Sequence, residues 1–266
     1  MTTWEIILLA IVQGLTEFLP VSSSGHLVVA NAVLEALGSE PVKDLVEVSV
    51  VLHLGTLAAV LIFYRRQILR LLTEDKRAIT PLVIATIPAV ILGLGIKKGL
   101  PESLEKTVLE SPLLAGLMFP ITAAALWWIS RQTPSDGEYT ELTPGQSLKI
   151  GLLQACALLP GISRSGATIV GGLASGLKRE QAATFAFLMA IPAIGGGGLL
   201  EGIEAYQEGT TGTPIGLLTL GFFVSMIVGL VALSLLIRWV KAGRLAMFAY
   251  YLVPLGVAVT AWQLLQ

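Results

Sequence analysis

The sequence has little charge and almost no cysteine. Only 13% of its 266 residues are charged, which is about half the share of a typical soluble domain. Cys156 is the one cysteine, so no disulfide can form within the chain. Because Cys156 lies in an apolar run, we expect it to serve packing rather than chemistry. The net charge of −1 offers no basic surface to nucleic acid, and no nucleic-acid partner is expected.

Long apolar runs are what the chain has instead. Hydrophobic residues make up 54% of it, and a helix that spans a bilayer needs about 20 of them in succession. Runs of this kind lie near 45–64, 81–96, 112–130, 182–200, 214–237 and 245–265. The sequence therefore predicts an all-α polytopic membrane protein, with six full spans in one integral membrane domain.

Two further regions, 4–37 and 148–178, are each interrupted by proline, glycine and serine. Irregular backbone at membrane depth must be buried in protein or line a wet cavity, so we expect two re-entrant helical hairpins.

The two interrupted regions show a faint sequence match. When the first region is aligned with the second so that Gln13 matches Gln154, three further identities appear. They pair Ser22, Ser24 and Gly25 with Ser163, Ser165 and Gly166. This match favours an inverted-topology repeat, with one unit over 1–130, a polar linker over 131–147 and a second unit over 148–266.

Lysine and arginine predict the orientation, because they are enriched in cytoplasmic loops. They gather in 65–80, in 238–244 and at 178–179, whereas 201–213 holds Glu201, Glu204 and Glu208 and no basic residue. This pattern places both termini outside. The weak point is 97–111, which would lie outside although it carries three lysines, offset by three glutamates.

The first interruption, 13–27, reads QGLTEFLPVSSSGHL and concentrates polar side chains at membrane depth. Such groups are costly there and mark a functional-site hypothesis. The hydroxyl of Ser23 could attack phosphorus if His26, three residues later, removed its proton. Glu17 could orient His26, act as the base itself or hold a divalent cation.

The second interruption, 159–169, reads LPGISRSGATI and contains Arg164. A buried guanidinium needs an anionic partner, which could be Glu17 in a structural salt bridge. It could also be phosphate, which the arginine fork binds with two parallel hydrogen bonds. Free backbone N–H groups and a helix N-terminus favour phosphate. The expected phosphate-binding residues are Arg164, Ser163, Ser165, Gly161, Gly166 and Thr168, with Ser22 and Ser24 from the first interruption.

At these residues the chain resembles the undecaprenyl-diphosphate phosphatase family, the bacitracin-resistance proteins. The family elements (E/Q)xxxE and FLPVSS(S/T)GH are matched at 13–17 and 18–26, and PGxSRSxxT is matched at 160–168. The resemblance implies a bacterial inner-membrane enzyme that removes the terminal phosphate of a C55 polyprenyl diphosphate. Such an enzyme recycles the lipid carrier for cell-wall synthesis and confers resistance to bacitracin.

The resemblance also implies roles for individual residues. Glu17, His26 and Arg164 match essential residues of the family, and Ser23 matches its proposed nucleophile. It implies dependence on Mg²⁺ or Ca²⁺ and a site open to the periplasm. Glu17 would hold the metal with Gln13, although some members have a glutamate at that position, which puts a two-carboxylate site in doubt. A homodimer is left open.

Two rival functions fit parts of the pattern. An inverted repeat with broken helices also suits a secondary transporter or a flippase for an anionic lipid. Ser24 and His26 alone would suit an intramembrane serine hydrolase, but Arg164 has no role there. His53, in the middle of a predicted span, is expected to pack in the core, with a place on the cavity wall as the alternative.

Overall fold

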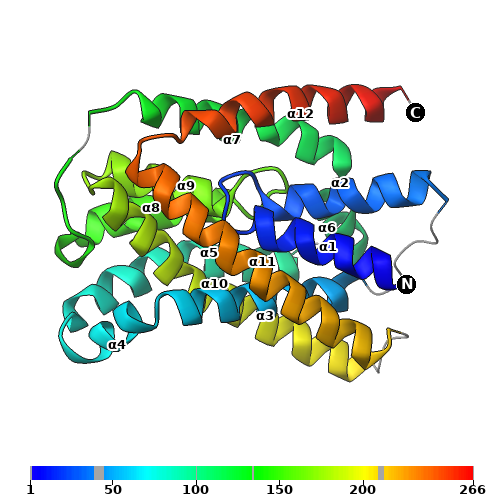
Figure 1. Cartoon of the computed structure of the whole chain (residues 1–266), viewed down its shortest axis with the longest axis horizontal. Coiled ribbons are helices and arrows are strands. Elements are labelled where there is room, and N and C mark those ends of the chain that lie inside the picture. The colour runs from blue at the N-terminus through cyan, green and yellow to red at the C-terminus, as the bar shows by residue number, and fades with distance from the viewer. Residues whose placement is uncertain (1, 39–44, 100, 134, 209–212, 266) are drawn as a thin grey trace.

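The computed structural model describes residues 2–38, 45–99, 101–133, 135–208 and 213–265, and the regular elements in these ranges are helices, without a named strand. The longer elements are α1 (Thr3–Thr16), α2 (Ser23–Ala36), α3 (Leu45–Phe63), α4 (Arg65–Thr73), α5 (Ile79–Gly99), α6 (Glu102–Leu109), α7 (Pro112–Ser130), α8 (Pro144–Cys156), α9 (Arg164–Ala174), α10 (Arg179–Glu208), α11 (Ile215–Lys241) and α12 (Ala246–Leu264) (Figure 1). Two short 3₁₀ turns, η1 (Lys76–Ala78) and η2 (Tyr139–Glu141), lie between them. The predicted all-α class is confirmed.

Five helices are long and apolar enough to cross a membrane: α5, α7, α10, α11 and α12. Helices α3 and α4 are long and apolar enough only when taken together, as one pair bent by 67°. The protein is therefore a multi-pass membrane protein, and its described residues contain five candidate spans, or six if the bent pair counts as one. Large apolar side chains such as Ile91 and Val257 are more than 60% exposed, as expected of a surface covered by lipid.

Four shorter helices form the two interrupted regions. With 14, 14, 13 and 11 residues, α1, α2, α8 and α9 each fall short of the roughly 20 residues that a crossing requires. They coincide with the predicted regions 4–37 and 148–178. The division of the chain into two inverted repeats stays a prediction.

Three loops expected from the sequence contain more helix than predicted. The 65–80 loop holds α4 and η1, the 97–111 loop holds α6, and α10 runs on to Glu208 rather than ending near 200. α4 is amphipathic, with Leu71 buried and several arginines on its other faces, so it forms as a separate short helix. The side chains of Glu201, Glu204 and Glu208 lie outside the described residues.

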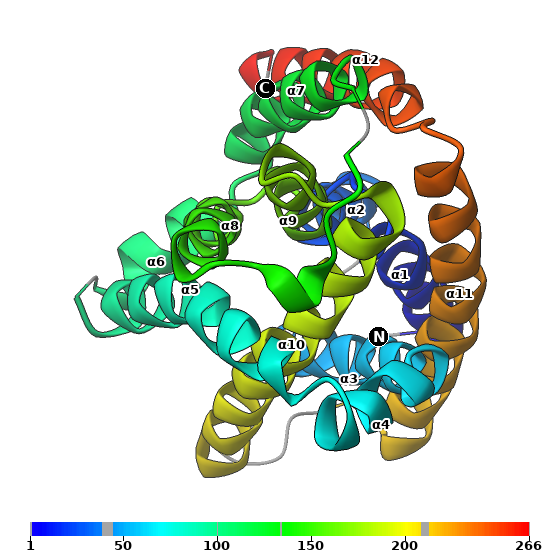
Figure 2. The same cartoon turned by 90° about the vertical axis from the view of Figure 1, so that its left-hand side faces the viewer.

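The core is centred on the first half of α10. Phe185, Phe187 and Met189 are fully buried there and belong to the largest apolar cluster. The α9 helix reaches α10 through a glycine: a Cβ on Gly172 would lie 3.0 Å from the Cβ of Ala182. Small residues let helices approach closely in membranes. The end-on view shows the outer helices arranged around this centre (Figure 2).

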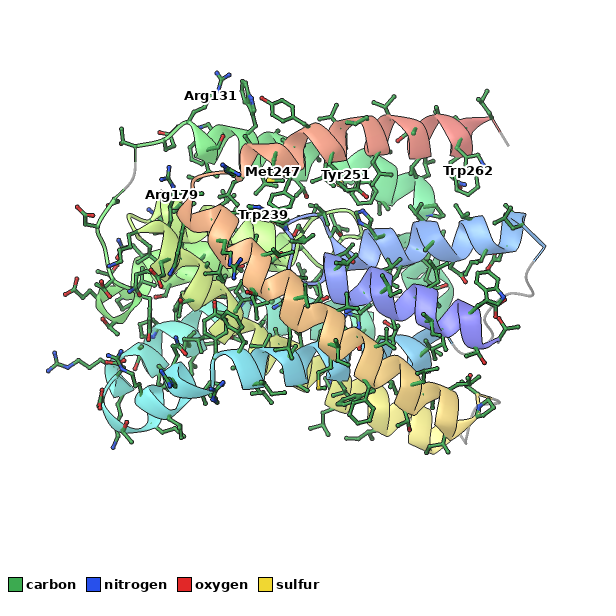
Figure 3. All side chains as sticks on the ribbon, in the orientation of Figure 1. Arg131, Arg179, Trp239, Met247, Tyr251 and Trp262 are labelled. Carbon is green, nitrogen blue, oxygen red and sulfur yellow. The ribbon has the colours of Figure 1, made fainter. Side chains whose placement is uncertain are left out.

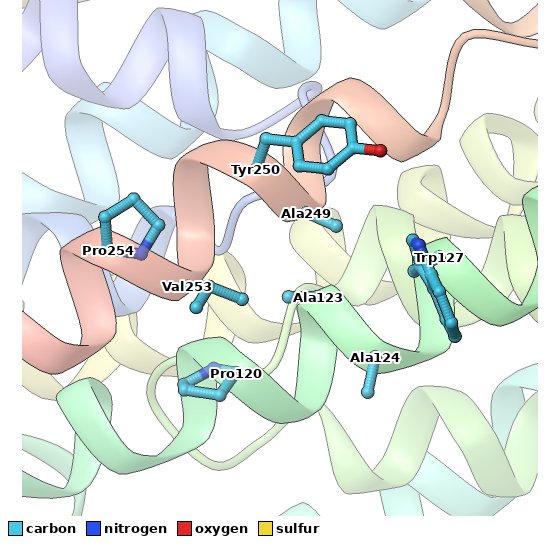
Figure 4. Close-up of a pocket in the computed structure, with 8 residues that line it drawn as sticks. All are labelled: Pro120, Ala123, Ala124, Trp127, Ala249, Tyr250, Val253 and Pro254. Atoms are coloured by element: carbon cyan, nitrogen blue, oxygen red, sulfur yellow. The ribbon is translucent and has the colours of Figure 1, made fainter.

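Along one side, α7 and α12 pack as a pair (Figure 1). Their crossing depends on glycine, because a Cβ on Gly256 would lie 2.8 Å from the carbonyl oxygen of Gly116. An apolar groove of about 410 Å³ runs between them, lined by Pro120, Trp127, Tyr250 and Pro254 among others (Figure 4). None of the predicted site residues lines this groove.

Candidate active site

The two interruptions contact each other directly. The backbone N–H of Gly161 donates a hydrogen bond to Ser22 Oγ (3.1 Å), and Ser165 Oγ donates to the carbonyl of Leu19 (3.2 Å). The first segment joins α1 to α2 and the second joins α8 to α9, so residues about 140 positions apart in the sequence share one site. The polar groups of each interruption are satisfied by the other, as burial at this depth requires.

A serine in each interruption caps the following helix. Ser22 Oγ accepts from the N–H of Gly25 (3.3 Å), and Ser163 Oγ accepts from the N–H of Gly166 (3.1 Å). Ser22 has φ of 73°, and among the described residues it is the one non-glycine with positive φ. A serine held in this conformation costs free energy, and such strain gathers at functional sites.

Glu17 is the centre of the site. It is 5% exposed, and its Oε1 pairs with Nη2 of Arg164. Its Oε2 accepts hydrogen bonds from Gln13 Nε2 (3.0 Å) and from Ser23 Oγ (2.6 Å). A buried carboxylate needs such partners to offset its lost hydration. The structure thus brings together Gln13, Glu17, Ser23 and Arg164.

His53 joins this group from α3. Its Nε2 lies 3.6 Å from Glu17 Oε2, and its Nδ1 lies 2.8 Å from the carbonyl oxygen of Ser49, one turn earlier. The sequence left two positions open for His53, in the core or on the cavity wall, and the structure places it beside the carboxylate. The only signal in the sequence was an ionisable side chain in the middle of an apolar run.

His26 lies in the same region but has different partners. Its Nδ1 is 2.7 Å from the carbonyl oxygen of Ser22, and its Nε2 is 2.8 Å from the hydroxyl of Tyr251 on α12. Both ring nitrogens are therefore engaged, and neither bond goes to Ser23. In this geometry the carboxylate of Glu17, rather than the imidazole, accepts the hydrogen bond of the predicted nucleophile.

The predicted phosphate-binding residues differ in what their side chains do. Ser163 and Ser165 lie with their hydroxyls 3.1 Å apart at the start of α9, beside Arg164. The hydroxyls of Ser22 and Ser24 are 3.4 Å apart. Thr168, by contrast, donates to the carbonyl of Arg164 (2.8 Å) and is turned onto its own helix.

The glycines permit close approach of the two interruptions. Gly161 has φ of +92°, and a Cβ there would lie 2.4 Å from the carbonyl oxygen of Ala115. A Cβ on Gly25 would lie 2.8 Å from the nitrogen of Gly161. Gly166 is less tightly enclosed, with Ser163 Cβ 3.1 Å from the position of its missing Cβ.

Sequence reasoning missed Tyr251 and also a residue behind the second interruption. The hydroxyl of Thr122 on α7 donates to the carbonyl of Gly161 (2.9 Å) and accepts from the N–H of Ser163 (3.1 Å). These two hydrogen bonds fix the backbone of the second interruption to α7. A single threonine in an apolar span carries no sequence signal for such a role.

A metal site can be tested against the donor atoms present. No group of three or more His, Cys, Asp or Glu within the described ranges could hold an ion. However, Gln13 Oε1 is buried without a hydrogen-bond partner, while its Nε2 bonds Glu17. Mg²⁺ is commonly held by one or two carboxylates together with oxygens of substrate phosphates. Glu17 and Gln13 therefore fit a hard cation whose remaining ligands come from a diphosphate.

The family model described as "Bacitracin resistance protein BacA" matches residues 6–258, which include both interruptions. The chain belongs to the BacA family. The resemblance drawn from the two motifs is thereby confirmed.

Curated relatives extend the BacA match over the whole chain. One, named undecaprenyl-diphosphatase, from Rhodopirellula baltica, is 46% identical over 256 residues and covers 96% of both chains. Another of that name, from Carboxydothermus hydrogenoformans, is 36% identical over 266 residues, which is 99% of this chain and 98% of the relative. A third, from Rubrobacter xylanophilus, is 39% identical over 282 residues, with 98% of each covered.

Proposed function

We propose that this BacA-family protein hydrolyses undecaprenyl diphosphate to undecaprenyl phosphate and inorganic phosphate. The observation that carries the proposal is a serine bonded to a buried carboxylate that is paired with an arginine, all at the junction of two broken helices. The names of the relatives supply the substrate. The apolar surface of the protein suits a substrate that is itself a lipid.

We assign phosphate binding to the second interruption. Arg164 has five N–H donors in a fixed fork, so it can bind phosphate oxygens while part of the guanidinium stays on Glu17. Ser163, Ser165 and the N-terminus of α9 add hydroxyl and backbone donors. These donors are fixed before the substrate arrives, which is the condition for stabilising charge in the transition state.

The chemistry proceeds in two steps in this proposal. Ser23 Oγ attacks the terminal phosphorus, its proton passes to Glu17 Oε2, and the anhydride P–O bond breaks to release undecaprenyl phosphate. The hydroxyl of Tyr251 then moves off His26 Nε2, a water molecule attacks the phosphoserine, and Nε2 takes the proton of that water. The serine oxygen leaves and recovers its proton from Glu17, inorganic phosphate is released, and His26 returns its proton to the departing phosphate or to solvent.

A divalent cation completes the proposed site. Mg²⁺ or Ca²⁺ would be held by Glu17 and Gln13, and when bound it would neutralise charge on the diphosphate. The support is the unpartnered amide oxygen of Gln13 beside the carboxylate.

The cellular setting is also part of the proposal. We place the protein in the bacterial inner membrane, with both termini outside, the site open to the periplasm and the two halves related as inverted repeats. There it would return the lipid carrier to cell-wall synthesis and confer resistance to bacitracin. A homodimer stays a prediction, which the molecular mass in detergent would test.

Phosphate release by the purified protein tests the function. In detergent with Mg²⁺, the wild type should release phosphate from a C55 diphosphate without any gradient, which a transporter would not do. We expect Arg164→Ala and Arg164→Lys to lower kcat/KM by about a hundredfold or more, since lysine keeps the charge but loses the fork.

The matched control is Arg131→Ala, because Arg131 stacks on Trp127 (3.6 Å from its ring centre), away from the site. This variant should keep wild-type activity, and gel filtration should show that all variants remain folded. Near-normal phosphate release by folded Arg164→Ala would refute the proposed role, and no release by the wild type would refute the function.

A further inference from the structure

Tyr251 reaches the site from a helix that the motifs do not include. It lies on α12, the last helix, and its hydroxyl is 2.8 Å from His26 Nε2. The two rings are nearly parallel, at 16°, with centroids 5.8 Å apart. Figure 3 shows Tyr251 on the side of α12 that faces the rest of the protein. Among the described residues, this hydrogen bond joins α12 to a predicted catalytic side chain.

The hydrogen bonds of His26 determine which of its nitrogens is basic. A carbonyl oxygen can only accept, so Nδ1, 2.7 Å from the carbonyl oxygen of Ser22, must carry a proton. In the neutral ring Nε2 then holds the lone pair, and the hydroxyl of Tyr251 must donate to it. For Nε2 to gain a proton from water the hydroxyl must first move off it, and once Nε2 is protonated the hydroxyl can return and accept. A tyrosine hydroxyl therefore suits both protonation states, and phenylalanine suits neither.

The ring of His26 also contacts a second aromatic side chain. Phe119 on α7 lies with its ring centroid 5.0 Å from that of His26, at an angle of 57°. Because α7 and α12 pack on each other, Phe119 and Tyr251 form one frame around the imidazole. The backbone of Ser22 fixes Nδ1, and this frame fixes the direction of Nε2.

Resting on the proposed hydrolysis, we propose that Tyr251 is a positioning residue for His26. It keeps Nε2 as the nitrogen that receives a proton, holds it in one orientation between turnovers, and exchanges donation for acceptance when the imidazole is protonated. Tyr251 acts through His26 in this assignment and does not touch the reacting phosphorus.

The test compares Tyr251→Phe with Tyr250→Phe. Tyr250, the next residue, is 72% exposed and lines the groove between α7 and α12, so it is a matched control on the same helix. We expect Tyr251→Phe to lower kcat by roughly five- to tenfold with little change in KM, as for loss of one hydrogen bond. Tyr250→Phe should leave both constants unchanged.

A second readout does not depend on activity. The chain has two histidines, so ¹⁵N labelling of histidine gives two imidazole spectra, which a His53→Gln variant assigns. Wild-type His26 should show a protonated Nδ1 and an unprotonated Nε2 that accepts a hydrogen bond. In Tyr251→Phe the Nε2 signal should move toward that of a free imidazole nitrogen, and in Tyr250→Phe it should not.

The outcomes separate the two proposals. If the wild type hydrolyses the diphosphate while Tyr251→Phe leaves kcat or the Nε2 signal unchanged, the role of Tyr251 is overturned and the proposed function stands. If the wild type releases no phosphate, the function falls and the role of Tyr251 in turnover falls with it, while the spectra still show whether Tyr251 bonds His26. A shifted Nε2 signal together with a reduced kcat supports both.

Discussion

At the scale of single residues, the site divides into two groups of hydrogen bonds. Glu17 connects Gln13, Ser23 and Arg164, while His26 is bonded to Ser22 and Tyr251. The carboxylate is placed to take the proton of the nucleophile, and the imidazole is placed elsewhere. This separation suggests that the two groups serve different steps of the reaction.

The separation predicts that the two groups have different phenotypes when mutated. In His26→Gln the first step should proceed and the second should be slow, so a phosphoserine at Ser23 should accumulate. In Glu17→Gln the amide cannot take the proton, so no phosphoserine should form and kcat should fall by about 10²-fold or more. Mass spectrometry of the peptide that contains Ser23, after incubation with substrate, measures both.

Two controls accompany this prediction. Glu35→Gln alters an exposed glutamate on α2 that accepts a hydrogen bond from Asn31, and it should behave like the wild type. Ser24→Ala should still form the phosphoserine, because the residue that becomes phosphorylated is Ser23. Absence of phosphoserine in folded His26→Gln protein would show that the imidazole acts in the first step instead.

At the scale of elements, the interruptions depend on backbone that only glycine tolerates. Gly161→Ala places a Cβ at φ of +92° and 2.4 Å from the carbonyl oxygen of Ala115. We expect it to lower stability by about 1–3 kcal/mol or more and to move Arg164 away from Glu17. Thermal unfolding in detergent, followed by circular dichroism, measures the first effect, and phosphate release measures the second.

The control for this substitution is Gly145→Ala in the first turn of α8. No atom lies within 4 Å of the Cβ that it would add, and its φ is not in the left-handed region. Alanine is favoured over glycine in such a helix, so stability should be equal or slightly higher. Equal melting temperatures for the two variants would contradict the requirement for glycine at position 161.

Much of this arrangement could be predicted from sequence, for identifiable reasons. The spans follow from apolar length, and the interruptions follow from proline, glycine and serine among polar groups. α4 and α6 were missed because short helices in charged loops carry no spanning signal. Thr122 and Tyr251 were missed because each is one polar residue in an apolar helix, and only tertiary packing brings it to the site.

At the scale of the whole molecule, the basic loops gather at one end. Lys178 donates to Glu138 in the linker (3.0 Å), and this bond raises the pKa of the lysine. Lys241 pairs with Glu180 (2.7 Å), and η1 contacts η2. Figures 1 and 2 show α4, the linker and the α11–α12 turn at this end, with both chain termini at the opposite end. The fold therefore gathers these basic loops at one end, as one orientation of all three requires, and which side that end faces stays a prediction.

Cysteine labelling would test that orientation in a Cys156→Ser background. Ser135 lies exposed in the linker, and Leu265 is 87% exposed beside the C-terminus. In intact spheroplasts a membrane-impermeant maleimide should label Leu265→Cys and leave Ser135→Cys unlabelled, because basic loops stay in the cytoplasm. Permeabilised cells, in which both positions should react, control for accessibility. Labelling of Ser135→Cys alone in intact spheroplasts would show that the linker is periplasmic and the C-terminus cytoplasmic. This result would contradict the predicted orientation.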